Sequence, residues 1–265
     1  MRQSQGLDSQ ESVVKPFPGF RGGFAAPSCV MAGTVAENAR FLSGRVNEIG
    51  LCFFECRSCL AYGENDLPPD LARLPLTWHV HLPLDLPWSG MYEADKTAKL
   101  AWKVFTRAAF LAPRLAVLHP PSGSPTLKRR LLRDFAVAWR RAAGDVPLLL
   151  ENIRCCDIAE LGKGFLPEHG LGFCLDVAHL LGYDQQRLLS SNLPETADLA
   201  HWSAPGRRDE HLPLTALTSG QRAVAAGLAS RFARNPVHLA EIFHWPGVEV
   251  SLPILETLTG GGGSA

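Results

Sequence analysis

The sequence lacks any run of about twenty apolar residues, the length that a membrane-spanning helix requires. Its opening segment, MRQSQGLDSQESVV, is polar and lacks the apolar stretch of a secretory signal. These two absences predict a soluble protein that stays in the cytoplasm and has no membrane partner.

An excess of charge of either sign is also missing, because 26 Lys and Arg residues balance 26 Asp and Glu residues. Binding to a long nucleic acid draws on a net positive surface that displaces counterions from the phosphates. The balance therefore disfavours a DNA partner without excluding one.

A disulfide framework is absent too. The seven cysteines are an odd number without regular spacing, which is typical of a reducing compartment. Cys56 and Cys59 form one C-x-x-C, with no second pair beside it to complete a zinc site. We interpret them as thiols near the end of a buried strand, with a metal-binding or redox pair as the alternative.

The chain is long enough for one large domain, since 46% of its 265 residues are hydrophobic. Short apolar runs alternate with amphipathic stretches, which is typical of repeated βα units. The sequence predicts a polar N-terminal extension over 1–20, a single (β/α)₈ TIM barrel over 21–258 and a flexible glycine-rich tail over 259–265. No linker between domains interrupts this pattern.

Eight apolar runs are predicted as the barrel strands. They cover 22–30, 48–55, 76–82, 115–119, 146–151, 171–176, 198–201 and 237–243. Helical periodicity is clearest over 98–112 and 126–143. We interpret the arginines of the second helix as a solvated face of the outer ring.

Residues that can bind metal stand at or just after the ends of six successive strands, the third to the eighth. In this barrel class, active sites are built where strands end and loops begin. The candidate metal ligands are His81, His119, Glu151, Asp176, His179, His201, Asp209, His211 and Glu241. Strand ends around one barrel lie within about 10 Å of its axis, so these side chains are expected to meet.

Five imidazoles and four carboxylates exceed the needs of one ion, because zinc takes about four ligands. The set predicts two or three divalent ions, zinc first, with manganese, iron or cobalt as alternatives. Closely spaced ions suit phosphate esters, since they neutralise phosphate oxygens and lower the pKa of a bound water. Hydrolysis is therefore favoured over isomerisation, with Glu151 and Glu241 as catalytic residues that position the water.

The other histidines have no comparable placement. His79 shares a strand face with His81, so it either supports the site or packs in the barrel interior. His169 lies in a turn, and His238 and His244 flank the last strand without reaching its mouth. We predict that these three bind no metal.

With these residues in place, the chain resembles the xylose-isomerase-like and endonuclease IV superfamily of TIM barrels from about residue 20 to 255. Endonuclease IV enzymes use three zinc ions, and the resemblance implies three sites here. They would be His81, His119 and Glu151; Glu151, Asp176, His201 and Glu241; and His179, Asp209 and His211. Sugar isomerases and epimerases of the superfamily usually keep only the second set. After the D-x-H, this chain departs from the DNA-repair enzymes, because DEHLPL lacks their glycine.

The segments HVHLPLDLPW, LENIR, CLDVAHLLGY and EIFHWPG are similar to the cobamide-remodelling phosphodiesterase family. That resemblance implies hydrolysis of the nucleotide loop of a cobamide, a cobalamin-type corrinoid, to cobinamide phosphate and an α-riboside. A bacterium could then rebuild the cofactor with another lower ligand. A bulky small molecule with one phosphodiester needs no long basic groove.

Three residues are expected to bind this corrinoid substrate. Trp88 ends a rigid apolar segment that either forms a rim or is only a βα turn. Arg207 and Arg208 precede Asp209 and either clamp the phosphate or stay solvated. The alternatives for function are an abasic-site endonuclease, a sugar isomerase or epimerase, and a corrinoid-binding module without catalysis. The sequence makes no prediction of oligomeric state.

Overall fold

The computed structural model describes residues 23–88, 94–208, 210–233 and 236–260. The N-terminal extension predicted over 1–20, and most of the glycine-rich tail, lie outside these residues. Helix α9 ends at Gly260, two residues past the predicted end of the barrel. The hydroxyl of Thr259 donates to the Leu255 carbonyl at 2.9 Å, which ties the last turn to the helix.

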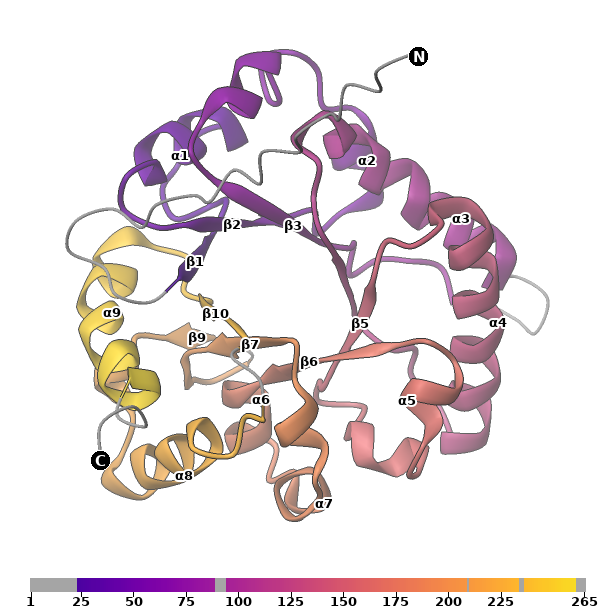
Figure 1. The fold of residues 1–265 in the computed structure, drawn as a ribbon, viewed down its shortest axis with the longest axis vertical. Coiled ribbons are helices and arrows are strands. Elements are labelled where there is room, and N and C mark those ends of the chain that lie inside the picture. The colour runs from indigo at the N-terminus through magenta and orange to yellow at the C-terminus, as the bar shows by residue number, and fades with distance from the viewer. Residues whose placement is uncertain (1–22, 89–93, 209, 234–235, 261–265) are drawn as a thin grey trace, which may run out of the picture.

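In the part of the chain described, eight parallel strands close into one barrel, in the order β1 to β7 and then β10 (Figure 1). They span Phe24–Pro27, Glu48–Cys52, Thr77–His81, Ala116–Leu118, Leu148–Glu151, Gly172–Asp176, Leu199–Trp202 and Val237–Ala240. All eight predicted strands are present, each shortened or shifted by a few residues at its ends. The (β/α)₈ prediction is confirmed.

Helices surround the barrel. The α-helices are α1 Val35–Leu42, α2 Cys56–Leu60, α3 Ala94–Phe105, α4 Pro125–Ala143, α5 Phe165–Glu168, α6 Val177–Gly182, α7 Gln186–Ser190, α8 Ser219–Ala229 and α9 Trp245–Gly260. Short 3₁₀ turns cover Pro69–Arg73, Thr106–Leu111, Ile158–Leu161, Leu193–Thr196 and Leu214–Ala216. Within these described segments no helix is long and apolar enough to cross a membrane.

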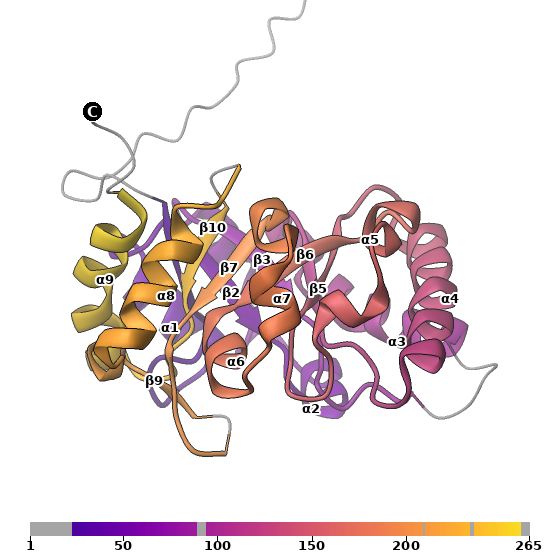
Figure 2. The ribbon, with the colours of Figure 1, turned by 90° about the horizontal axis from the view of Figure 1, so that it is seen from below.

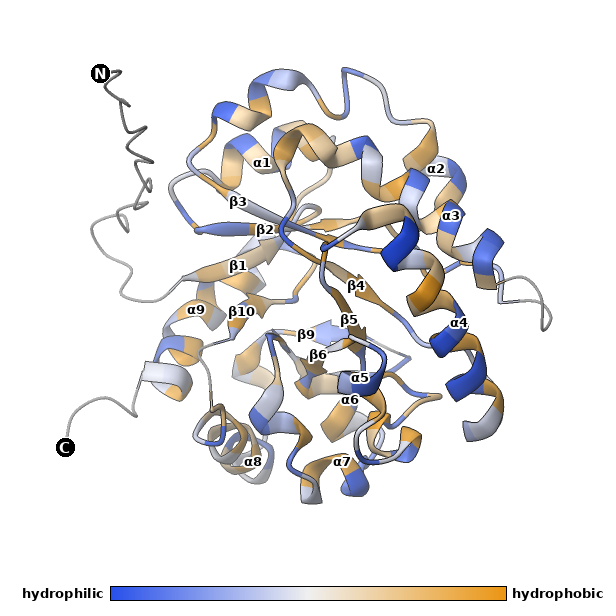
Figure 3. Cartoon of the chain, turned by 45° about the vertical axis from the view of Figure 1, so that its right-hand side comes forward, coloured by the Kyte–Doolittle hydropathy of each residue, from blue (hydrophilic) through white to orange (hydrophobic). Residues whose placement is uncertain are grey.

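Local signals explain where the long helix α4 starts and stops. Ser124 caps its first turn by accepting from the Leu127 amide, and Pro125 occupies the first helical position. Gly144 ends it with a φ of 62°. Figure 3 shows hydrophilic residues along the outer side of α4, while strands β4 and β5 carry the hydrophobic colour.

The barrel interior is filled by its own apolar layer, which we call the floor. It consists of Ala25, Leu115, Val117, Leu149, Cys174, Leu199 and Leu239. A larger core lies between the strands and the helices. Since side chains alternate along a strand, residues two positions beyond the floor also point inward, one layer closer to the mouth.

One further pair of strands lies outside the barrel. Strands β8, Ala204–Pro205, and β9, His211–Leu212, form a small antiparallel hairpin after β7. Figure 2 shows this hairpin on the same side of the barrel as α6, which begins directly after β6. The hairpin thus carries His211 to the mouth.

Candidate metal centre

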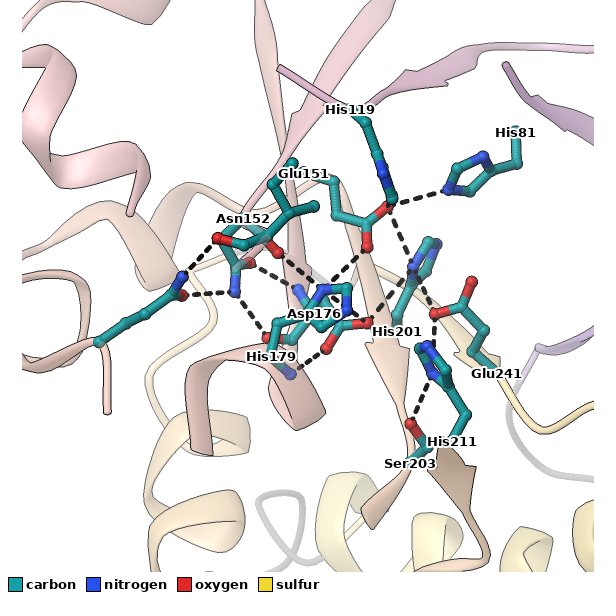
Figure 4. Close-up of polar contacts among 12 residues, drawn as sticks. His81, His119, Glu151, Asn152, Asp176, His179, His201, Ser203, His211 and Glu241 are labelled. Carbon is teal, nitrogen blue, oxygen red and sulfur yellow. Dashed lines mark hydrogen bonds and ion pairs between the residues drawn. The ribbon is translucent and has the colours of Figure 1, made fainter. Parts of the chain in front are cut away.

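Five candidate ligands, at the ends of five different strands, each lie two residues after a residue of the floor. Glu151 comes two residues after Leu149, and His119, Asp176, His201 and Glu241 each follow a floor residue at the same spacing. Parallel pairing also sets Asp176 beside His201 on β6 and β7. The period of two therefore places these side chains inside the barrel, on the mouth side of the floor (Figure 4).

The first group of side chains joins β3, β4 and β5. The Nε2 atoms of His81 and His119 lie 3.1 and 3.3 Å from Oε2 of Glu151. His81 is held in place because its Nδ1 lies 3.0 Å from the Leu82 carbonyl, which turns Nε2 toward the centre. These three residues are predicted to share one ion, and their ligand atoms lie within 4.8 Å of one another.

The second group lies deeper and shares Glu151 with the first. Its members are Glu151, Asp176, His201 and Glu241, all buried, with ligand atoms again within 4.8 Å. His201 Nδ1 lies 3.0 Å from Glu241 Oε2. This contact counts as an ion pair, because four buried atoms make no hydrogen bond among the described residues. They are Nδ1 and Nε2 of His201, Oδ2 of Asp176 and Oε2 of Glu241. Buried polar atoms that converge without hydrogen bonds fit a bound cation, which would satisfy all of them.

The third group consists of Asp176, His179 and His211. Asp176 caps α6, since its Oδ1 accepts from the His179 amide at 2.5 Å, which leaves Oδ2 for the centre. His211 Nδ1 lies 3.0 Å from the Ser203 hydroxyl and 3.4 Å from Glu241 Oε2. The remaining predicted ligand, Asp209, lies outside the described residues.

The imidazoles of the cluster balance the negative charges of its carboxylates. Burial alone would raise the pKa of the Glu151 carboxyl, but His119 and His201 hold that pKa well below its usual range. Burial would likewise lower the pKa of His179, but Asp176 and Glu151 raise it to about 10. Divalent ions would displace these protons and supply the same positive charge. The donor set of oxygens and imidazole nitrogens suits zinc or another first-row divalent metal.

Cys174 belongs to the floor but reaches the second group, since its ligand atom lies within 4.8 Å of those of Glu151 and His201. The sequence did not single it out. Burial raises the pKa of its thiol to about 12, and its side chain closes the site from below.

Asn152 is a positioning residue that the sequence analysis missed. Its side chain accepts from the Asp176 amide at 2.7 Å and donates to the Asp176 carbonyl at 2.8 Å and to Gln185 at 2.9 Å. Its own carbonyl lies 2.9 Å from His179 Nδ1. One fully buried residue thus holds two of the three members of the third group.

Replacing Asn152 with alanine is expected to leave the Asp176 amide unpaired in the interior. We expect the free energy of unfolding to fall by about 1–3 kcal/mol and metal affinity to fall about 10- to 100-fold. Thermal unfolding and metal competition with a chelating dye measure the two effects. The exposed amide of Asn192 gives the control, and equal metal affinity in Asn152→Ala and Asn192→Ala would contradict the assigned role.

Two cavities open over the ligand layer and share His179 and His211. The aromatic cavity, of about 190 Å³, is walled by Phe54, Leu84 and Phe243 above the first group. The rings of Phe54 and Phe243 lie 5.7 Å apart, centre to centre. The arginine cavity, of about 240 Å³, is lined by Arg154, Tyr183 and Arg208 beside the third group.

The predicted substrate-binding residues fall in different places. Arg208 lines the arginine cavity, whereas Arg207 is exposed on the same hairpin and, as far as the described residues show, lines neither cavity. Trp88 packs instead on α4, with its ring 5.2 Å from that of Phe135, so it is absent from the described cavity walls. Packing on Phe135 buries the indole better than the open mouth would.

The remaining histidines and the C-x-x-C take structural places. His79 is buried against Glu48, with Nδ1 2.6 Å from Oε1, which settles it as interior packing. His238 accepts from Trp202 Nε1 at 3.1 Å. Cys56 and Cys59 are buried in α2, and burial raises the pKa of the Cys56 thiol to about 12. This fits the interpretation of thiols near the end of a buried strand, since α2 begins shortly after β2.

Among known proteins, no family model and no curated sequence matches this chain. Solved structures do. A D-tagatose 3-epimerase-like protein superposes with a TM-score of 0.66 at 15% identity, over 91% of this chain and 98% of that one. Endonuclease IV from Thermus thermophilus superposes with a TM-score of 0.64 at 20% identity, over 91% and 99%. The chain has the fold of these barrels.

A third structure carries a metal in its description. The IOLI protein "with a binding zinc atom" superposes with a TM-score of 0.57 at 11% identity, over 91% of this chain and 96% of that one. Identities this low show the fold alone, so the reaction must be argued from the side chains of the cluster.

Proposed function

We propose that the chain is a metal-dependent phosphodiesterase that hydrolyses the nucleotide loop of cobamides to cobinamide phosphate and an α-riboside. The observation that carries the proposal is the continuity of the three ligand groups. Glu151 belongs to the first and second groups, and Asp176 belongs to the second and third. Shared carboxylates between neighbouring groups are what a site for two or three ions requires.

The chemistry divides between the ions and the chain. Bound divalent ions would neutralise the phosphate oxygens and lower the pKa of water at the mouth. Glu151 and Glu241 are the catalytic residues of this proposal. Glu241 Oε2, buried and without a hydrogen bond among the described residues, is placed to orient the attacking water. Asn152 and Ser203 hold the imidazoles of His179 and His211, so the cluster keeps its shape as charge develops on the phosphate.

The cavities favour a small substrate with one phosphodiester. Both are compact, and the aromatic cavity offers two phenylalanine rings to a flat base. The chain has no net positive charge that would favour binding to a duplex. A cobamide has both parts, a phosphodiester and an aromatic lower-ligand base.

A sugar isomerase or epimerase is the second candidate, because the group of Glu151, Asp176, His201 and Glu241 is complete by itself. An abasic-site endonuclease is the third, since the barrel of endonuclease IV has the same fold.

Product analysis separates these functions. The metal-loaded protein is incubated with cobalamin and adenosyl-pseudocobalamin, with abasic duplex DNA and with a panel of ketoses, and metal content is measured on the same sample. We expect cobinamide phosphate from the corrinoids and more than one ion per chain. Sugar interconversion with a single ion would support the isomerase, and nicking of DNA with steep salt dependence would support the endonuclease.

A further inference from the structure

A three-layer stack connects the third ligand group to the arginine cavity. The ring of Tyr183 stacks on that of His179 at 5.7 Å with an interplanar angle of 26°. The guanidinium carbon of Arg154 lies 5.8 Å from the centre of the Tyr183 ring. Arg154 therefore lies next to the metal-binding layer, one ring away from His179.

Among the described residues, guanidinium groups outnumber carboxylates in the walls of the arginine cavity. Arg154 and Arg208 supply the two guanidinium groups, and Glu210 supplies the carboxylate. Arg208 adopts a left-handed backbone with a φ of 53°, a conformation that costs free energy in a residue other than glycine. Backbone strain of this kind is frequent at binding and catalytic sites, and the Arg208 side chain lines the cavity.

The aromatic cavity has the opposite character. Phe54 packs edge-on against the His81 ring at 5.6 Å, and Phe243 packs on that of His211 at 5.2 Å. The two cavities meet at His179 and His211, so a phosphate over the ligand layer would have one ester arm facing each.

We propose that the site binds its diester in one direction, with the anionic half in the arginine cavity and the flat leaving half against the rings of Phe54 and Phe243. The inference rests on the proposed hydrolysis. In that reaction the oxygen of water bonds to phosphorus, the bond from phosphorus to the riboside oxygen breaks, and the riboside leaves with a proton. The retained half becomes a phosphomonoester with a charge of about −1.5 to −2, which two guanidiniums bind. The leaving half is neutral and carries an aromatic base, which the phenylalanines bind.

The test uses the metal-loaded enzyme and two kinds of readout. Arg154→Ala is compared with Arg57→Ala, which removes an exposed guanidinium from α2 on the same side of the barrel. Calorimetry with inorganic phosphate measures anion binding without turnover. We expect Arg154→Ala to raise the Kd for phosphate and the KM for the cobamide each about tenfold, with metal content unchanged and kcat altered less than about twofold. Arg57→Ala should match the unaltered protein, and Arg154→Lys should recover part of the loss.

A panel of cobamides with different lower-ligand bases tests the direction of binding. Arg154→Ala should reduce kcat/KM by the same factor for every base, whereas Phe54→Ala should reduce it by different factors. The reverse pattern, or an unchanged Kd for phosphate in Arg154→Ala, would overturn the proposal. If the unaltered enzyme cleaves no cobamide, the proposed function fails, while phosphate binding still decides whether the arginine cavity is an anion site.

Discussion

Glu151→Gln is expected to lose metal and activity together while the barrel stays folded. Glu151 is the one residue that joins the first and second ligand groups, and its carboxylate lies within 4 Å of the imidazoles of His81, His119 and His201. An amide keeps the shape of the side chain but removes the charge that holds cations between these rings. We expect kcat to fall on the order of 10³-fold or more.

Elemental analysis and circular dichroism on one sample check both halves of this expectation. The matched control is Glu256→Gln, which makes the same change at an exposed position of α9. A Glu151→Gln protein with the turnover and metal content of the control would refute the shared role of the carboxylate. A protein that fails to fold would show in the circular dichroism spectrum, and Glu151→Asp, which keeps the charge, then provides the test.

His119→Ala is expected to distinguish a hydrolase from an isomerase. His119 belongs to the first group alone and lies outside the set of Glu151, Asp176, His201 and Glu241. Its side chain is only partly buried, so the loss of the ring should disturb packing little. The metal content should fall by about one ion per chain, and phosphodiester hydrolysis should fall about 10²- to 10³-fold.

An isomerase that uses only the deeper group would keep its rate in this variant. His169→Ala is a suitable control, because His169 directly follows the short helix α5, away from all three groups. Unchanged metal content and unchanged turnover in His119→Ala would support the isomerase and count against the multinuclear site.

The strands and the convergence of most candidate ligands could be predicted from the sequence because both follow from one alternation. On β5, for example, the apolar Leu149 packs in the floor, and the polar Glu151, two positions later, points inward at the mouth. The predicted positions of the strand ends were less accurate, since the first predicted strand ran to residue 30 whereas β1 ends at Pro27.

The residues that the sequence did not predict act through contacts between distant segments. Asn152 is bonded to Asp176 and Gln185, 24 and 33 residues further along the chain, and no local pattern shows such pairing. Arg154 and Tyr183 meet only because β5 and β6 are neighbours in the barrel. The contact of Trp88 with Phe135, on a helix far along the chain, is of the same kind.

The apolar floor also limits the order in which molecules can enter and leave. Leu149, Leu199 and Leu239 fill the barrel beneath the ligands, so the mouth is the route that ions, water and substrate have in common. A bound phosphomonoester would then lie between the deeper ions and the solvent. We expect inactivation by a chelator to slow down when product is present, with the second ligand group emptying last.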